Sequence, residues 1–381
     1  AKGLAHASVL KVLEEAGVRV DFIGGTSMGA MIGALYASGY NATEIDSLVR
    51  VIDFERILLD DVPRKSKPFY EKESGENYAL TLPIKGKRVG IPMAISEGQN
   101  VLNLFTRLTQ HVSHINDFSK LPIPFVCIAT NLETGQQETL RSGFLPQAVK
   151  ASGSFPTLLA PVEIDGKILT DGGVVNNFPV EEVRAMGADV IIGVDIQSGL
   201  SEGDELDSFV KIVNQIVGFQ MYRTLPYKHD MVDLLIKPDM KNFNVVSFDK
   251  ADEIMHEGEV ASRALFSELQ SIANRQKGVR PVKIPIKHIN RFHIDTIQIT
   301  GNNNYTKAYI QGKLNLKKRD TTSYNNLITS INNLTATGNF ESIEYTITDG
   351  LNGASVKFNV KENRVSNFLH IGAHYDDPVS Y

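Results

Sequence analysis

The feature that most constrains the fold is the segment FIGGTSMGA at residues 22–30, which contains the pattern G-x-S-x-G around Ser27. A β-rich segment, residues 18–23, leads into it, and helix-forming residues 28–37 follow it. In this context a serine lies on a sharp strand-to-helix turn, where its hydroxyl is exposed beside helix amides. Because Gly25 and Gly29 have no Cβ atom, we expect them to avoid clashes that other residues would cause in so tight a turn. The sequence therefore predicts a strand, a turn that presents Ser27, and a helix.

Composition limits the classes of protein that need to be considered. The chain has 381 residues, enough for two or three domains, and 42% of them are hydrophobic, which is ample for a sizeable core. The net charge of −5 provides no basic field, so we expect no nucleic-acid partner. From residue 277 onward, however, 13 basic residues stand against 8 acidic ones, compared with 26 against 36 before it. An acidic front region is thus joined to a basic, Asn-rich tail region.

The one cysteine, Cys127, excludes an internal disulfide, and its apolar neighbours predict a small buried core residue. No segment reaches the roughly 18 apolar residues of a membrane-spanning helix. No signal peptide is visible either. Because the sequence begins at Ala1 rather than at methionine, we expect a mature or truncated form.

The front region alternates between helical and β-rich segments. Residues 3–16 place Leu4, Val9, Val12, Leu13 and Ala16 on one helical face, and Gly17 ends that helix. Further short strands are predicted at 126–130, 168–170, 190–196 and 232–236, and longer helices at 209–223 and 251–276. This alternation favours an α/β fold around a mostly parallel sheet. Residues 64–92, rich in Lys, Gly and Pro, are predicted to form an inserted hairpin or flap.

The tail region has a different character. Residues 276–290 are basic, contain two prolines and suit a linker. They are followed by predicted segments in the order β-α-α-β-β: 292–300, 307–314, 324–337, 340–348 and 354–360. This order predicts a separate, small α+β domain. Residues 366–375 then alternate polar and apolar side chains, and since a single strand is not stable alone, we expect the full protein to continue beyond Tyr381.

A serine hydroxyl needs a neighbouring base before it becomes a good nucleophile. The usual Ser-His-Asp arrangement fits poorly, because Ser27 lies very early in the chain and the available histidines, His229 and His256, are predicted surface residues. The alternative base is Asp171, which ends an apolar strand and precedes two glycines. Carboxyl ends of strands are where α/β sheets assemble their sites, and burial would raise the pKa of this carboxyl above about 3.9. Taken alone, Asp-Gly-Gly also suits an ordinary turn.

Taken together, these segments resemble the patatin-like phospholipase family. The elbow spans Gly25 to Gly29, and the family's second signature matches Asp171-Gly172-Gly173. The resemblance extends to residues 150–156, 161–162 and 176–179, and it covers roughly residues 1–275. It implies a three-layer sandwich, with Ser27 and Asp171 as a catalytic dyad and Gly25, Gly29, Gly172 and Gly173 as motif glycines.

The same resemblance implies the oxyanion hole and the reaction. Ala1-Lys2-Gly3 looks like the end of the family's glycine-rich loop, so the amides of Gly3 and Met28 are expected to meet developing negative charge. Lys2 is expected to be structural. The implied reaction is two-step acyl transfer through an acyl-serine, which requires no metal and no cofactor. His111 and His114 have a spacing that could suit a metal, but a solvated helix face is the preferred interpretation.

The tail resembles two modules of bacterial envelopes. Residues 291–363 resemble a POTRA domain, with Gly301 and residues 337–343 as cues, and residues 364–381 look like the first strand of a truncated outer-membrane β-barrel. The order is that of type V patatin autotransporters. It implies the outer membrane of a Gram-negative bacterium, with the catalytic domain periplasmic or surface-exposed. Barrel-assembly machinery is an implied partner, and a homo-oligomer is left open.

The leading hypothesis is therefore a serine lipid acyl hydrolase of phospholipase A or lysophospholipase type, acting on phospholipids or other acyl-ester lipids. The alternative is a secretion, assembly or binding module of the outer membrane whose hydrolase-like passenger is catalytically unimportant. A Ser27→Ala exchange that leaves the cellular phenotype unchanged would favour the alternative.

Overall fold

The structure is a computed structural model that describes residues 1–60, 80–85, 88–89, 94–200, 209–276, 278, 286, 290–350, 352–363 and 367–371. The described residues fall into two compact units. Unit 1 is drawn from Ala1–Leu59 and Leu104–His288, and unit 2 from Asp60–Asn103 and Ile289–Tyr381. Each unit is described by itself below.

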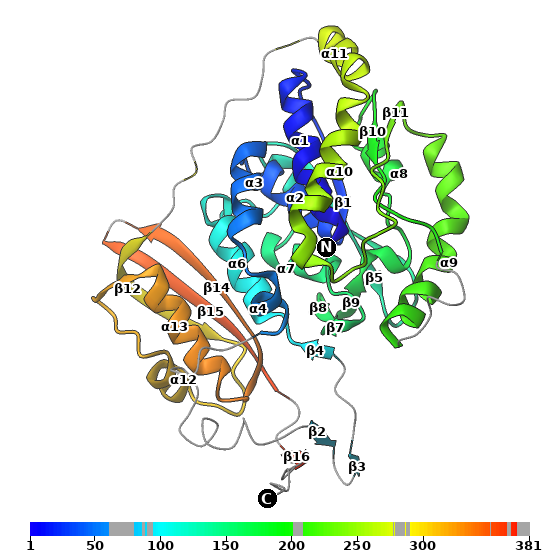
Figure 1. Ribbon diagram of the computed structural model, residues 1–381. Helices are drawn as coiled ribbons and strands as arrows, with labels where there is room; N and C mark the ends of the chain where they lie inside the picture. The colour runs from blue at the N-terminus through cyan, green and yellow to red at the C-terminus, as the bar shows by residue number, and fades with distance from the viewer. Residues whose placement is uncertain are drawn as a thin grey trace, which may run out of the picture. The chain divides into compact units, whose positions relative to one another are not determined.

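Unit 1 alternates helices and strands, as the sequence predicts (Figure 1). Its elements are η1 (Lys2–Leu4), α1 (Ala5–Glu15), β1 (Ile23–Thr26), α2 (Met28–Ala37), α3 (Ala42–Val51), α4 (Phe54–Leu58), η3 (Gln110–Val112), η4 (Phe118–Lys120), β5 (Phe125–Asn131), β6 (Gln137–Leu140), α7 (Leu145–Ser152), β7 (Thr157–Leu159), β8 (Val162–Ile164), β9 (Lys167–Asp171), η5 (Gly172–Val174), α8 (Val180–Ala185), β10 (Ile192–Val194), α9 (Phe209–His229), β11 (Leu234–Ile236), η7 (Phe248–Lys250), α10 (Ala251–Arg263) and α11 (Phe266–Arg275). The helix α6 (Gln99–Leu108) has residues in both units.

The predicted α/β class is confirmed, but the expected mostly parallel sheet is a mixed one. Parallel pairing joins β1 to β5 and β10 to β11. By contrast, β5 pairs antiparallel with β6 and β9, and β9 pairs antiparallel with β8. The link between β8 and β9 is a two-residue turn, Asp165-Gly166, and both residues have positive φ. So short a connection permits only an antiparallel hairpin.

The strand before the elbow lies later in the chain than the sequence predicts. The β-rich residues 18–22 are not a strand, and β1 covers Ile23–Thr26. Its register with the fully buried β5 runs from Ile23 opposite Phe125 to Thr26 opposite Ile128. Partner strands, rather than local composition, therefore set the limits of β1. The helix that follows the elbow, α2, spans Met28–Ala37 as predicted, whereas the predicted helix 251–276 is two helices, α10 and α11.

Helices cover both faces of β1. A Cβ on Gly24 would meet Val183 of α8, and a Cβ on Gly25 would meet the backbone of Gly29 in α2. Successive residues of a strand point to opposite faces, so α8 and α2 cover opposite sides of the sheet. The helix α1 packs beside α10 (Figure 1), and its apolar face contributes Val9, Val12 and Leu13 to a core shared with β10, β11 and α11. The layered arrangement predicted for this region is confirmed.

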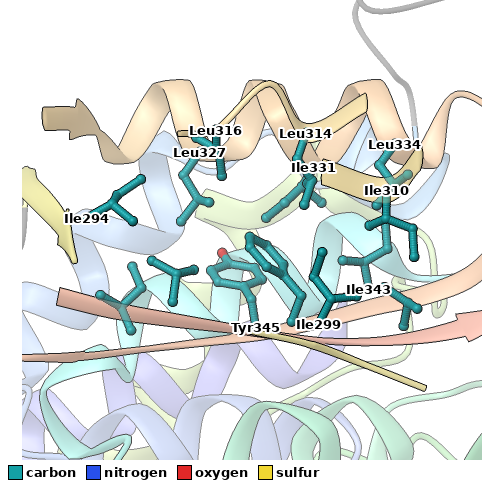
Figure 2. Packing of buried hydrophobic residues seen from close by; sticks show 14 of the residues in the cluster. Ile294, Ile299, Ile310, Leu314, Leu316, Leu327, Ile331, Leu334, Ile343 and Tyr345 are labelled. Carbon is teal, nitrogen blue, oxygen red and sulfur yellow. The ribbon is translucent and has the colours of Figure 1, made fainter. Parts of the chain in front are cut away.

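Unit 2 contains the predicted β-α-α-β-β order. Its elements are β2 (Leu80–Lys85), β3 (Arg88–Val89), β4 (Ala94–Ser96), β12 (Arg291–Thr300), α12 (Lys307–Leu314), β13 (Thr321–Ser323), α13 (Tyr324–Thr335), β14 (Phe340–Gly350), β15 (Gly353–Glu362) and β16 (Asn367–Ile371). The sheet order is β13-β12-β15-β14, with β12 parallel and β14 antiparallel to β15. Figure 2 shows its core, in which Leu327, Ile331 and Leu334 of α13 pack against side chains of the sheet such as Tyr345 and Ile343.

Some predicted segments are described only in part. Most of the predicted flap at 64–92 and of the linker at 276–290 lies outside the described residues, as do residues 364–366 and 372–381 of the predicted barrel strand. Within the described part, β2 pairs antiparallel with both β3 and β16. The barrel start at 364–381 remains a prediction. Among the described helices, none is both long and apolar enough to cross a bilayer.

Candidate active site

The elbow holds Ser27 in an unusual backbone conformation. Ser27 is the N-cap of α2, with φ 54° and ψ −125°. A positive φ is costly for a residue with a Cβ and occurs mainly where the surroundings enforce it. One enforcing contact is the hydrogen bond from the Ser27 N–H to the Oγ of Ser152, at 3.0 Å. Ser152 is fully buried at the end of α7, so a rigid helix anchors the turn.

The base predicted from the sequence lies against the predicted nucleophile. The Ser27 hydroxyl donates to Oδ2 of Asp171 at 2.5 Å, although 144 positions separate the two residues. Asp171 is the last residue of β9, opposite Ala129 of β5, and β5 in turn pairs with β1. The Asp171 carbonyl accepts from Thr130 Oγ1 at 2.8 Å, and its N–H donates to the Ser154 carbonyl at 3.0 Å. Sheet pairing thus brings the two side chains together.

Burial raises the pKa of the Asp171 carboxyl toward neutral pH. The residue is 3% exposed. Loss of solvation raises its pKa from 3.8 to about 6, and the hydrogen bonds from the Ser27 hydroxyl and the Gly173 N–H limit that rise. The Gly173 N–H donates to Oδ1 at 2.7 Å, which leaves Oδ2 to the serine. A carboxylate with a pKa near the working pH is suited to accept a proton from a hydroxyl.

A buried lysine holds the loop that follows Asp171. Lys228, on α9, donates from Nζ to the Asn176 Oδ1 at 2.6 Å and to the Phe178 carbonyl at 3.0 Å. The Asn176 carbonyl accepts from Thr26 Oγ1 at 2.9 Å, directly before the nucleophile. Sequence reasoning missed Lys228 and Ser152 as supports of the site. Ser152 lies in the segment 150–156 that carries the family resemblance, whereas no local signal marks Lys228.

Gly3 and Met28, whose amides are the predicted oxyanion donors, lie close together. A Cβ on Gly3 would fall 2.3 Å from the Cβ of Met28, so only a glycine allows η1 to approach the start of α2 this closely. Met28 is the first residue of α2, and a helix provides no acceptor for its first amides. The Gly3 carbonyl accepts a hydrogen bond from Nδ1 of the partly buried His6 at 2.8 Å. Burial lowers the pKa of His6, which favours a neutral imidazole beneath the elbow.

The motif glycines differ in how tightly they are packed. A Cβ on Gly25 would lie 2.5 Å from the Gly29 carbonyl oxygen, and one on Gly172 would lie 2.2 Å from the Ile128 carbonyl oxygen. On Gly173 it would lie 2.9 Å from the Asp171 carboxylate. The clash predicted for Gly29 is wrong, because a Cβ there would meet only the His6 ring, at 3.7 Å.

Within the described residues, none of the histidines considered above is hydrogen-bonded to Ser27. His229, predicted to be a surface residue, is instead half-buried, with Nε2 3.0 Å from Oδ2 of the buried Asp195. It lies near the end of α9, where packing against Phe178 covers its ring. His256 is exposed on α10, and His111 contacts the Ser38 carbonyl through Nε2 at 2.7 Å. In the part of the chain that the structure describes, no three metal-ligating side chains cluster together.

A cavity of about 710 Å³ lies behind the elbow, between β1 and β10. Apolar side chains of α1, β1, α8 and β10 line it, and His6, Asp195 and Gln197 provide polar lining. The lining includes Gly25 and Thr26 but neither Ser27 nor Asp171. The cavity therefore does not reach the two predicted catalytic residues. Cys127, as predicted, is fully buried.

Family models match two parts of the chain. Residues 1–184 match the model described as "Patatin-like phospholipase", and residues 292–363 match the POTRA model described as "Surface antigen variable number repeat". The POTRA match has nearly the expected bounds of 291–363, whereas the patatin match ends at residue 184, short of the expected residue 275.

Curated relatives match about 70% of the chain. Lysophospholipase NTE1 of Meyerozyma guilliermondii is 27% identical over 300 residues, which is 71% of this chain and 19% of the relative. Lysophospholipase NTE1 of Saccharomyces cerevisiae is 29% identical over 288 residues, which is 68% of this chain and 15% of the relative. The chain therefore spans less than a fifth of the length of these relatives. The solved structure of VipD from Legionella pneumophila aligns with 70% of this chain and 65% of its own, at 14% identity and a TM-score of 0.39.

Proposed function

Because the chain joins a patatin-like phospholipase domain to a POTRA domain, we propose that it is a serine lipid acyl hydrolase of phospholipase A or lysophospholipase type. The observation that carries the proposal is the hydrogen bond from the Ser27 hydroxyl to Asp171 at 2.5 Å. It joins a nucleophile on a strained turn to a buried base with a raised pKa, in a domain whose curated relatives are named lysophospholipases.

In the first step Ser27 Oγ attacks the ester carbonyl carbon as Asp171 Oδ2 takes the hydroxyl proton. The carbonyl oxygen becomes an oxyanion that the amides of Gly3 and Met28 meet, and each such donor contributes typically about 3 kcal/mol. The bond to the alcohol then breaks, the proton passes from Asp171 to the leaving oxygen, and an acyl-serine remains.

In the second step a water molecule gives its proton to Asp171 and attacks the acyl carbon. Collapse of this oxyanion breaks the bond to Ser27 Oγ, which recovers the proton, and releases the fatty acid. Both steps begin with an ionised Asp171, so turnover is expected to fall as the pH drops below about 6. The neighbouring Asp195 and His229 take no part in this scheme.

The substrate and the location follow from the two domains. We propose phospholipids or other acyl-ester lipids as substrates, and an outer-membrane setting in which the POTRA domain engages barrel-assembly machinery. The match of residues 292–363 to a surface-antigen repeat supports this setting.

The test is release of fatty acid from defined glycerophospholipids, lysophospholipids and triglycerides by the purified chain. We expect Ser27→Ala and Asp171→Asn each to lower the rate by at least a hundredfold, the smallest effect typical of losing a general base being about that size. Ser47→Ala on α3 and Asp165→Asn in the β8–β9 turn are matched controls at exposed positions and should retain the rate. The proposal fails if no lipid is hydrolysed, or if both active-site variants remain fully active.

A further inference from the structure

The solvent-facing side of α9 is apolar, which is the reverse of an ordinary surface helix. Ile212 is 43% exposed, Ile216 59%, Phe219 54% and Tyr227 63%. At 3.6 residues per turn these four positions fall within a sector of about 80° on the helix. We call these four side chains the α9 stripe. Isolated exposed apolar residues are common, but an aligned row of them marks an interaction surface.

The stripe is not the side of α9 that packs on the core of unit 1, because the opposite side of the helix is buried there. Leu225 and Tyr222 pack with Phe178, Val180 and Ile191 in one apolar cluster. Lys228 is buried as well, with its ammonium bonded to the loop after Asp171. Within the described residues, α9 therefore presents apolar side chains both to the core of unit 1 and, through the stripe, to solvent.

The charge of α9 favours an anionic partner. Its 21 residues include no Asp or Glu, and of its basic residues Arg223 is exposed, whereas Lys228 is buried and paired with Glu181. Arg223 is exposed in the middle of the sector that the stripe occupies. A helix that combines an exposed apolar row containing Phe and Tyr with basic residues suits the interface of a membrane that contains anionic lipids.

The position of α9 relative to the reacting groups supports the same partner. α9 packs against η5, which directly follows Asp171. Its Lys228 reaches Asn176, and Asn176 holds Thr26, the residue before Ser27. The same helix thus carries the exposed stripe and a side chain that is hydrogen-bonded to the loop after Asp171.

We propose that the α9 stripe docks unit 1 onto an anionic lipid surface. The proposal rests on the proposed function for its purpose, since it supplies the route by which a lipid substrate is reached. A second copy of the chain fits less well, because four side chains exposed by about half present only roughly 400 Å², against about 800 Å² per partner in a stable interface.

The experiment measures vesicle binding separately from hydrolysis. A Ser27→Ala chain, which binds without hydrolysing, is floated with vesicles of phosphatidylcholine containing about one third phosphatidylglycerol. Adding Ile216→Ser and Phe219→Ser should weaken partitioning by about tenfold to a hundredfold, since two half-exposed apolar side chains no longer enter the interface. Adding Val51→Ser and Val260→Ser, which removes two exposed apolar side chains elsewhere in unit 1, should not weaken it.

Charge gives a second readout. Arg223→Gln should weaken binding to the anionic vesicles by about fivefold and leave binding to pure phosphatidylcholine unchanged. With Ser27 intact, the Ile216→Ser/Phe219→Ser chain should hydrolyse a soluble short-chain ester at the normal rate and vesicle lipid more slowly. Failure of the unmodified chain to cleave any ester refutes the proposed function but leaves the flotation result standing.

Three results would overturn docking on lipid. One is absence of flotation by the Ser27→Ala chain, and another is flotation of the stripe variant equal to that of its control. The third is a dimer of the unmodified chain that the stripe variant converts to monomer without a change in flotation, which would assign the stripe to a second copy of the chain.

Discussion

Replacing Asp171 by asparagine is expected to abolish turnover while making the protein more stable at alkaline pH. The exchange keeps the two hydrogen bonds of the site, because the amide oxygen can accept from the Gly173 N–H and the amide NH₂ can donate to Ser27 Oγ. What it removes is a buried negative charge, whose burial costs free energy.

The magnitude follows from the pKa of Asp171, which is raised from 3.8 to about 6 mainly by loss of solvation. Folding therefore favours the protonated carboxyl, and stability is lost as the pH rises from the unfolded pKa through the folded one. The difference between the two pKa values corresponds to about 3 kcal/mol at pH 8, and to about 1 kcal/mol at pH 4.5. Asp171→Asn buries no charge, so the gain in its free energy of unfolding over the unmodified chain should be largest at high pH.

Thermal unfolding at pH 8 and pH 4.5 measures this effect. For a unit of this size about 3 kcal/mol corresponds to a rise in Tm of roughly 6 to 12 °C at pH 8, and the rise should shrink to about a third at pH 4.5. Asp165→Asn, at an exposed turn position with φ 51°, is the matched control and should change stability by no more than about 0.5 kcal/mol.

Two results would refute the reasoning. A Tm of Asp171→Asn below that of the unmodified chain at pH 8 would mean that the carboxylate stabilises the site rather than straining it. A Tm difference that does not change with pH would mean that burial does not raise the pKa of Asp171.

The elbow yields three further predictions. Ser27→Gly should be about 1 kcal/mol more stable than Ser27→Ala in denaturant unfolding, since only glycine tolerates φ 54° without strain; equal stabilities would show that the turn relaxes. Gly25→Ala should cost about 1 to 3 kcal/mol through its clash with the Gly29 carbonyl, whereas Gly29→Ala should be neutral or stabilising by up to about 1 kcal/mol, and the reverse order would contradict the packing. Ser152→Ala, which removes the acceptor of the Ser27 N–H, should cost about 1 to 3 kcal/mol and lower turnover; an unchanged Tm would show that this bond does not anchor the elbow.

The parts of the fold that could be predicted from sequence are those with a local signal. The helix at 28–37 and the β-α-α-β-β order of the tail follow from periodicity and from turn residues, and the structure confirms them. The start of β1 could not be predicted, because residues 18–22 are as β-rich as the strand itself and only the register with β5 selects Ile23–Thr26. The antiparallel turn between β8 and β9 was missed although it has a local signal, because Asp165-Gly166 is a dipeptide typical of two-residue hairpins.

The residues of the candidate site likewise fall into those that a local sequence pattern marks and those that it does not. G-x-S-x-G and Asp-Gly-Gly are short patterns that mark Ser27 and Asp171, because the tight turns at these residues require glycine at Gly25 and Gly172. No local pattern marks Lys228, whose role depends on a hydrogen bond to a residue 52 positions away. Likewise His229 was expected at the surface, and only the fold shows that it pairs with the buried Asp195.

By itself, then, the sequence predicted which residues carry the chemistry, since Ser27 and Asp171 each lie in a short motif with their own glycines. Only the tertiary structure decided how they act together. It brings Ser27 and Asp171 within 2.5 Å across 144 residues, and it buries the carboxyl so that its pKa rises to about 6. It also leaves the α9 stripe facing solvent, although the same residues in the sequence suit a buried helix. Burial and long-range contact are properties of the packed chain, and no short segment contains them.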